Sequence, residues 1–270
     1  MNSSGDGAPS DQPLLVERRG PALWITLNRP RAANALTPPQ RNRIIELLEE
    51  ASGDQQTRVV VLAAEGKHFC SGADLSGGNG EPPATGDIAR TLRTGSQRLI
   101  ASVLDCEKPV VAELHGAAAG IGAHLVLACD FVVASEEARI IEVFARRGLV
   151  PDGGGTYLLP RLVGPMRAKE LMMLADDLPA DRARDLGIVT SVVPAEQLRA
   201  AVDELVTRLA AAPTRTLALC KWLVNRSLES SRDQCFADEA MAQEQNMGTH
   251  DAQEGVGAFV EKRPPAFRGR

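Results

Sequence analysis

Apolar residues recur along the chain in short blocks whose spacing predicts strands. Residues 14–27 alternate between apolar and polar side chains and break at a Gly-Pro pair, which predicts a β-hairpin. Residues 59–64 form a continuous apolar run that is typical of a buried strand. Two further runs, at 109–114 and 131–134, predict strands on the same grounds.

The segments between these strands have the spacing of helices. Thr37 should begin a helix, because Gln40 follows at the distance of a capping box and prolines stand just inside. Residues 88–104 repeat apolar side chains at helical spacing and predict a second helix. Alternating strands and helices favour βαβ units. This pattern alone fits both a flat doubly wound sheet and a spiral of stacked units.

From about Pro194 onward the chain shows helical spacing only. The expected helices lie around 195–211, 214–229, 232–247 and 251–262. We therefore expect a strand-and-helix core at 13–194 and an all-helical part at 195–270. Residues 1–12 are rich in Ser, Gly, Asp, Asn and Pro, without a basic start or an apolar centre. They are expected to be a disordered tail and not a signal peptide.

Composition narrows the class of protein without identifying it. The chain has 270 residues, of which 44% are hydrophobic and 24% charged, as in globular proteins with a sizeable core. A net charge of −5 gives no general attraction to nucleic acid. No apolar run reaches the ~18 residues of a membrane span, so no membrane is expected as a partner. Five cysteines without a Cys-x-x-Cys pair fit free thiols in a reducing compartment, and we expect a cytoplasmic protein.

Two glycine-containing turns form the candidate site. Residues 66–75 (GKHFCSGADL) follow the predicted strand at 59–64, and residues 115–124 (HGAAAGIGAH) lie between two apolar runs. Glycine lets the backbone approach another backbone or a ligand closely. A turn that opens a helix also leaves N–H groups without partners. Such donors suit an anion, or an oxygen that becomes anionic during a reaction.

Neither turn matches a nucleotide-binding or hydrolase signature. Leu125 stands where the dinucleotide fingerprint requires its third glycine, and the turn at 66–67 lacks the flanking residues of a P-loop. Phe69 replaces the first glycine of a nucleophile elbow around Ser71. No cluster of His, Cys, Asp or Glu has metal-ligand spacing, so no metal is expected.

The order of the motifs resembles the crotonase superfamily of enoyl-CoA hydratases and isomerases. The matching segments are residues 34–36, 69–75, 116–122, 151–156 and 259–263. The resemblance covers nearly the whole chain from about Leu14. It implies an α/β fold, with a crotonase-like ββα spiral core and a C-terminal all-helical oligomerisation domain. It also implies a homotrimer or homohexamer.

This resemblance implies an acyl-CoA substrate and an oxyanion hole made by the backbone N–H groups of Ala73 and Ile121. Negative charge develops on the thioester oxygen during enolisation, and two fixed donors can each contribute ~3 kcal/mol in the transition state. The implied coenzyme A contacts are Arg31, Ala33, Lys67, Ser71, Asp74, Leu75 and Lys262, with Arg263 beside the last. No cofactor is implied, because the coenzyme A belongs to the substrate.

The acid/base residues depart from the hydratase pattern of the family. Hydratases use two glutamates, but His124 stands at the first position and Phe144 at the second, with Glu142 two residues before it. On an extended strand that offset keeps the same face but moves the carboxylate by ~6–7 Å. Ordinary hydratase chemistry is therefore not expected.

Asp152 is the acid/base candidate that remains. Residues 148–161 resemble the bacterial 1,2-epoxyphenylacetyl-CoA isomerases, in which the equivalent aspartate is taken as the acid/base. An aspartate among apolar neighbours should have a raised pKa, which suits proton transfer. An Asx cap on the following helix is the alternative interpretation. His124 is either a second polar group near the acyl chain or a core histidine.

Three functions are compatible with these residues. An enoyl-CoA isomerase that shifts a double bond, with Asp152 as acid/base, is favoured. An enoyl-CoA hydratase of fatty-acid or aromatic-acid degradation would need rearranged acid/base groups, such as His124, Asp152 and Glu142. A catalytically silent acyl-CoA binder would need only the two turns.

Overall fold

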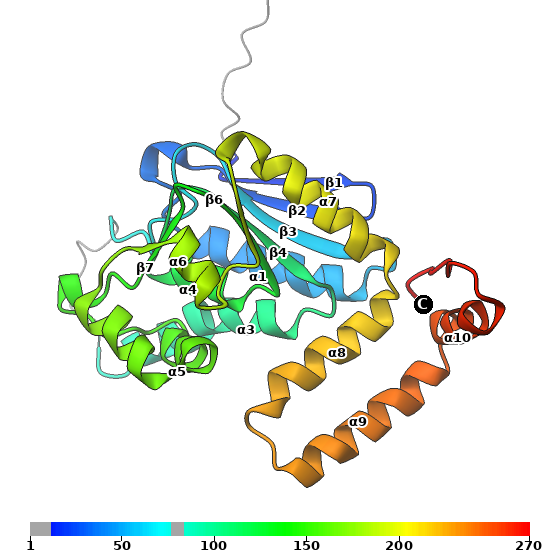
Figure 1. Ribbon diagram of the computed structural model, residues 1–270. Coiled ribbons are helices and arrows are strands. Elements are labelled where there is room, and N and C mark those ends of the chain that lie inside the picture. The colour runs from blue at the N-terminus through cyan, green and yellow to red at the C-terminus, as the bar shows by residue number, and fades with distance from the viewer. Residues whose placement is uncertain (1–11, 77–83) are drawn as a thin grey trace, which may run out of the picture.

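A six-stranded sheet in the order β1-β2-β3-β4-β6-β9 is the framework of the fold (Figure 1). The computed structural model describes residues 12–76 and 84–270, so nearly all of the predicted tail lies outside the described residues. The first two strands form the predicted antiparallel hairpin, and the remaining pairs are parallel. The strands are β1 (Leu14–Arg19), β2 (Ala22–Leu27), β3 (Val59–Ala64), β4 (Val110–Leu114), β6 (Phe131–Ser135) and β9 (Ser191–Val193).

A second, three-stranded sheet decides between the flat and the spiral arrangement. It contains β5 (Ala117–Ala119), β7 (Arg139–Ile141) and β8 (Leu178–Pro179). β4 is followed by β5 of the small sheet and then by a helix, and β6 is followed by β7 and later by another helix. Two successive units therefore have the same ββα order. The fold is therefore the crotonase spiral. These short strands show no readable period in the sequence.

Helices cover both faces of the large sheet. α1 (Pro38–Gly53) begins with the predicted capping box, in which the side chain of Thr37 accepts a hydrogen bond from the Gln40 N–H. The predicted helix at 88–104 consists of α2 (Asp87–Thr91), a π-helical segment (Leu92–Ser96) and α3 (Gln97–Asp105). Figure 1 shows α1 and α3 on one face of the sheet and α7 on the other.

The alternating side chains of β3 explain why this strand is apolar throughout. Val60 and Leu62 belong to the cluster with α1 and α3, whereas Val59 and Val61 belong to the cluster with α7 (Leu198–Ala211). Successive side chains of a strand point to opposite faces, so a sheet covered on both sides needs apolar residues at every position.

The last three helices form an arm that projects from the sheet, hereafter the arm (Figure 1). They are α8 (Thr214–Ser227), α9 (Arg232–Met247) and α10 (His250–Glu261), and beyond Val193 the described chain contains helices but no strand, as predicted. α7 does not belong to the arm, because Leu205 and Leu209 pack against the sheet within the same chain. No helix in the described ranges is long and apolar enough to cross a membrane.

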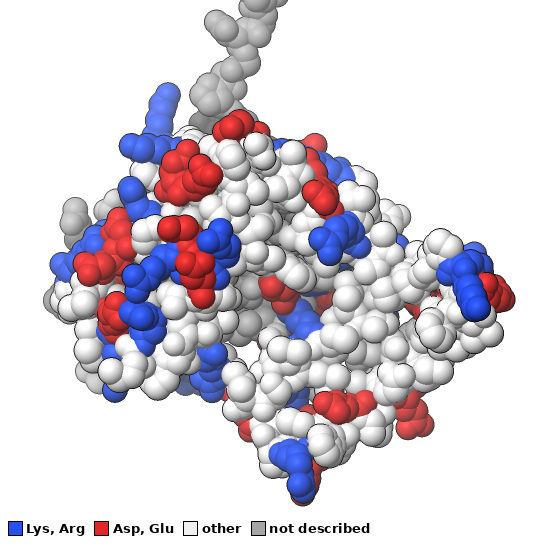
Figure 2. Space-filling view, in the orientation of Figure 1, with Lys and Arg blue, Asp and Glu red and all other residues white. Residues whose placement is uncertain are grey.

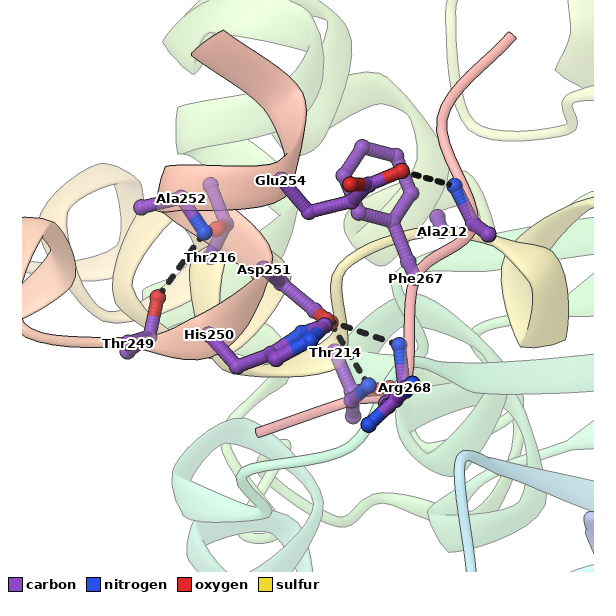
Figure 3. Close-up of polar contacts among 12 residues, drawn as sticks. Ala212, Thr214, Thr216, Thr249, His250, Asp251, Ala252, Glu254, Phe267 and Arg268 are labelled. Atoms are coloured by element: carbon purple, nitrogen blue, oxygen red, sulfur yellow. Dashed lines mark hydrogen bonds and ion pairs between the residues drawn. The ribbon is translucent and has the colours of Figure 1, made fainter. Parts of the chain in front are cut away.

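The end of the chain folds back onto the start of α10, as Figure 3 shows. The buried carboxylate of Asp251 accepts hydrogen bonds from the backbone N–H groups of Arg268 and Gly269, at 2.7 and 2.6 Å. Arg58, just before β3, donates to a carbonyl of the same segment at 3.3 Å. The C-terminal segment, residues 264–270, thereby connects the arm to the sheet.

Candidate active site

The two predicted turns lie side by side. The Phe69 N–H donates to the His115 carbonyl at 3.1 Å, and the Ala119 N–H donates to the Cys70 carbonyl at 2.8 Å. A Cβ atom at Gly120 would lie 3.8 Å from the Cα of the glycine at position 72. These two glycines directly precede the predicted donors, which therefore stand on adjacent backbone segments.

Both predicted donors are available. Neither the Ala73 N–H nor the Ile121 N–H donates to an acceptor among residues 12–76 and 84–270. Their neighbours are fixed, since the Asp74 N–H donates to the Leu36 carbonyl at 2.9 Å and the Leu36 N–H donates to the carbonyl of residue 72 at 2.8 Å. Ile121 is the first residue of α4 (Ile121–Ala128), where N–H groups have no intrahelical partner. The pair could stabilise an oxyanion, and this role stays a prediction.

Glycine is required where the turns approach each other. A Cβ atom at Gly122 would lie 2.6 Å from the Cys70 carbonyl oxygen, closer than van der Waals contact allows. The thiol of Cys70 is fully buried, and burial raises its pKa to about 12. It is therefore neutral near pH 7 and unsuited to act as a nucleophile.

His124 lies at the centre of the residues that depart from the hydratase pattern. Its ring is fully buried, its Nε2 is 3.1 Å from Glu142 Oε2, and it stacks on Phe144 with ring centroids 5.2 Å apart. The assumption of an extended strand through these residues is wrong. β7 ends at Ile141 and Phe144 has helical dihedrals, so Glu142 and Phe144 contact the same imidazole.

Asp152 precedes a glycine loop that packs against His124. A Cβ atom at Gly153 would lie 3.0 Å from His124 Nδ1, and one at Gly155 would overlap the same ring. Burial raises the pKa of the half-buried Asp152 carboxyl, as predicted, and only a protonated His124 would act in the opposite direction. The alternative role as a helix cap is wrong, because Gly154 is the N-cap of α5 (Gly155–Leu174) and no side chain caps it.

The side chain of Asp74, a predicted coenzyme A contact, forms hydrogen bonds within the chain. It accepts hydrogen bonds from Ser76 and from Arg29 Nη1, the latter at 2.8 Å, and these hydrogen bonds lower its pKa to about 2. The Ser71 N–H donates to the Ala33 carbonyl at 3.0 Å, which brings the loop after β2 against the first turn. Sequence reasoning did not find Arg29, because no local signal marks its partner 45 residues away.

The remaining predicted contacts do not all meet in one chain. Lys67 lines a cavity of about 420 Å³ beside the second turn, and both Arg31 and Leu75 are exposed. Lys262 directly follows α10, on the opposite side of the molecule from α4 and β7 in Figure 1. Arg263 donates hydrogen bonds to Glu254 and Glu261, both on α10. Lys262 could reach the site only across a subunit boundary.

The other two histidines near the turns have backbone partners. His68 Nδ1 accepts from the Ala117 N–H at 3.3 Å, and His115 Nε2 is 2.9 Å from the Gly66 carbonyl oxygen. In the described part of the chain, no group of His, Cys, Asp or Glu could hold a metal ion.

A ββα spiral with two free backbone donors at paired glycine turns has the architecture of the crotonase superfamily. The profile of the enoyl-CoA hydratase/isomerase family matches residues 18–270, and the chain belongs to this family. The resemblance seen in the motifs is thus confirmed.

Relatives with both kinds of activity resemble the chain. It is 37% identical over 246 residues to the "Probable enoyl-CoA hydratase" of Rhodobacter capsulatus, a match covering 91% of this chain and 94% of that protein. It is 34% identical over 250 residues to the 1,2-epoxyphenylacetyl-CoA isomerase of Escherichia coli, covering 92% and 95%. An enoyl-CoA hydratase crystal structure from Bacillus anthracis has a TM-score of 0.89 at 31% identity, covering 96% and 100%. Family membership leaves hydratase and isomerase open.

Proposed function

We propose that the protein is an enoyl-CoA isomerase that shifts a double bond in an acyl-CoA thioester. The observation that carries this proposal is the carboxyl group of Asp152, whose pKa is raised and which directly precedes a glycine packed against Ile121 and His124, while His124 and Phe144 stand at the positions of the hydratase glutamates. One carboxylate on one face of the substrate is enough for a double-bond shift. Adding water requires a second group to activate the water.

The proposed reaction moves one proton. The thioester oxygen accepts hydrogen bonds from the Ala73 and Ile121 N–H groups and becomes an enolate oxygen when Asp152 removes a proton from C2 of a 3-enoyl-CoA. The electron pair of the broken C2–H bond forms the C1–C2 double bond of the enolate. As the enolate collapses, this pair becomes the C2–C3 double bond, and the π pair of the C3–C4 double bond forms the new C4–H bond. Asp152 returns the proton at C4, so the carboxylate is regenerated. Because the donors are fixed before reaction, they stabilise the enolate without reorganisation.

The binding of coenzyme A is part of the same proposal. Arg31 and Lys67 are positive side chains near the first turn, and Lys262 of a neighbouring subunit would add a third. No cofactor is needed, because the proton is exchanged between substrate and Asp152 only. A trimer or hexamer would bring the end of α10 to another subunit's site.

Enzyme assays with two substrates test this function. Purified protein should convert a 3-enoyl-CoA to its 2-enoyl isomer, and should hydrate crotonyl-CoA orders of magnitude more slowly. Asp152→Asn keeps the size of the side chain but cannot accept a proton, so isomerisation should slow by about 10²–10⁴-fold. Affinity for acyl-CoA should barely change. Asp185→Asn, an exposed aspartate outside the site, is the matched control. Brisk crotonyl-CoA hydration, or intact isomerisation in Asp152→Asn, would overturn the proposal.

A hydratase is the second candidate, and one observation favours it. Glu142 and His124 form a buried carboxylate–imidazole pair, the arrangement by which many enzymes prepare a histidine base. With Asp152 as the acid, this pair could activate water. The relative rates on the two substrates above distinguish the candidates.

A further inference from the structure

The Glu142–His124 pair has two unsatisfied polar atoms. Glu142 is 4% exposed and His124 is 0% exposed, yet a single hydrogen bond of 3.1 Å joins them. His124 Nδ1 and Glu142 Oε1 have no hydrogen-bond partner among the residues that the structure describes. Buried polar atoms are almost always paired, because desolvation without a partner costs about 1–3 kcal/mol. Two such atoms in one pair indicate that they form a further hydrogen bond when the substrate is bound or during the reaction.

The ring of His124 is held in one orientation. His124 follows Ile121 by three residues on α4, so its side chain lies on the same face and leans toward the oxyanion turn. Phe144 stacks on it with an interplanar angle of 14°. A Cβ atom at Gly153 would lie 3.0 Å from Nδ1, and one at Gly155 would lie 2.2 Å from Nε2, so both glycines leave space that the ring fills. Nδ1 is therefore the ring nitrogen beside Gly153, the residue directly after Asp152, whereas Nε2 lies toward Gly155 and Glu142.

The chemistry of a carboxylate fixes which ring nitrogen carries the proton. An ionised carboxylate can only accept hydrogen bonds, so an ionised Glu142 accepts one at Oε2 from Nε2–H, and the proton stays on Nε2. A neutral imidazole with its proton on Nε2 has a lone pair on Nδ1. The atom facing the Asp152 loop is then an acceptor.

We propose that Glu142 is a positioning residue that holds neutral His124 in the Nε2–H tautomer, so that Nδ1 accepts a hydrogen bond from Asp152 while Asp152 carries the substrate proton. This rests on the proposed function, in which Asp152 moves that proton from C2 to C4. No covalent bond changes at His124. The proton stays on the Asp152 carboxyl, and its hydrogen bond to Nδ1 keeps it from exchanging with water before it reaches C4.

The tautomer can be measured directly. The chain has four histidines, so ¹⁵N-histidine labelling gives a simple nitrogen spectrum, and His124→Asn identifies the signals of His124. In the wild type, the shifts should report a proton on Nε2 and a bare Nδ1. Glu142→Gln can donate an amide N–H to Nε2, so the form with a proton on Nδ1 should grow. A wild type without the Nε2–H form, or a tautomer unaffected by Glu142→Gln, would overturn the proposal.

Isotope transfer tests the consequence for catalysis. With a 3-enoyl-CoA deuterated at C2, the wild type should keep much of the label at C4 of the product. Glu142→Gln should lose label to water and lower kcat by about tenfold at unchanged KM, a smaller loss than removal of the acid/base itself. Glu136→Gln, an exposed glutamate on the preceding turn, is the matched control and should retain wild-type label transfer.

A second variant keeps the test decisive if Glu142→Gln folds poorly. His124→Asn retains a polar atom near the position of Nδ1 without a Glu142 partner, whereas His124→Leu retains none. His124→Asn should therefore keep more label at C4 than His124→Leu. Equal label transfer in both, with normal isomerisation, would refute the role of Nδ1 and leave the proposed function standing. Absence of isomerisation in the wild type would instead refute the proposed function, whatever the tautomer.

Discussion

The properties of Asp152 depend on where the loop before α5 places it. Its carboxyl group is half-buried beside the His124 ring, and burial raises its pKa above the ordinary value of 3.8. The same ring contacts Glu142 and Phe144, so one imidazole joins all the residues that separate this chain from the hydratase pattern. At this scale, the environment of a few side chains sets the pKa and the contacts of the proposed acid/base residue.

The pH dependence of kcat/KM should reflect the ionisation of Asp152. The residue acts as a base only when ionised, so kcat/KM should fall as the pH drops through its pKa, with a midpoint above pH 3.8.

The raised pKa of Asp152 also means that folding favours the protonated form of its carboxyl group. Its contribution to stability is present below pH 3.8 and is lost as the pH rises through the folded-state value. Asp152→Asn should therefore melt at or above the wild-type temperature at pH 7, which calorimetry can check. A clearly lower melting temperature would contradict this.

At the scale of elements, the N-termini of the helices differ in how their backbone N–H groups are satisfied. Thr37 caps α1 through its side chain, whereas α4 begins at Ile121 after Gly120 with no side-chain cap. Of these two helix starts, the uncapped one belongs to the candidate site. A side-chain oxygen there would occupy the N–H groups that an oxyanion needs.

Replacing Ile121 by proline tests the backbone donor. Proline is well tolerated at the first position of a helix, but it has no N–H. Ile121→Pro should therefore keep the fold and lower kcat by about 10²–10³-fold. Ile121→Ala keeps the N–H and should retain turnover within a few-fold, as measured by steady-state kinetics with circular dichroism as a check on folding. Near-normal activity in Ile121→Pro would exclude this donor from the mechanism.

Another helix start, that of α10, fastens the end of the chain. Hydrogen bonds to Asp251 outweigh the effect of its burial and lower its pKa below 3.8, so its stabilising contribution is present above that pH and is lost on acidification. Asp251→Asn should lower the free energy of unfolding by about 1–3 kcal/mol in urea denaturation at pH 7. Asp233→Asn, at the same helical position of α9 but largely exposed, should change it little. Equal effects of the two substitutions would argue against the C-terminal segment as a fastening.

At the scale of the whole molecule, the arm exposes several large apolar side chains that a soluble monomer would usually bury. Phe259 is 85% exposed, Val260 73% and Phe236 61%, and Figure 2 shows broad uncharged areas on the arm around a few acidic patches. Soluble monomers rarely leave such patches uncovered. We propose that the arm packs against other copies of the chain, which would also bring Lys262 near a neighbouring site.

Assembly can be measured by light scattering. The particle mass should be three or six times the 28.8 kDa of one chain at micromolar concentration. Phe259→Glu with Val260→Glu should place two charges in the interface and shift the mass toward one chain. The same double change should raise KM for acyl-CoA if Lys262 acts across the boundary. A wild type that runs as a monomer would contradict the proposal.

The sequence by itself determined the features that depend on neighbouring residues. The hairpin at 14–27, the buried strand at 59–64, the start of α1 and the helical C-terminal part follow from local spacing, capping and turn chemistry. The two glycine turns could also be predicted from the sequence, because a close approach of two backbone segments requires glycine at that position. The raised pKa of Asp152 followed from its apolar neighbours.

The tertiary structure alone decided which distant residues meet. α7 reads like the other C-terminal helices, yet it covers the sheet, because its apolar stripe matches a sheet face formed by strands far away in the sequence. Asp74 is bound by Arg29, and His124 by Glu142, through contacts across 45 and 18 residues that leave no local signature. Such partners depend on how the strands are ordered and where each one ends. For this reason the sequence could indicate the residues of the site, but only the folded chain decided what each side chain contacts.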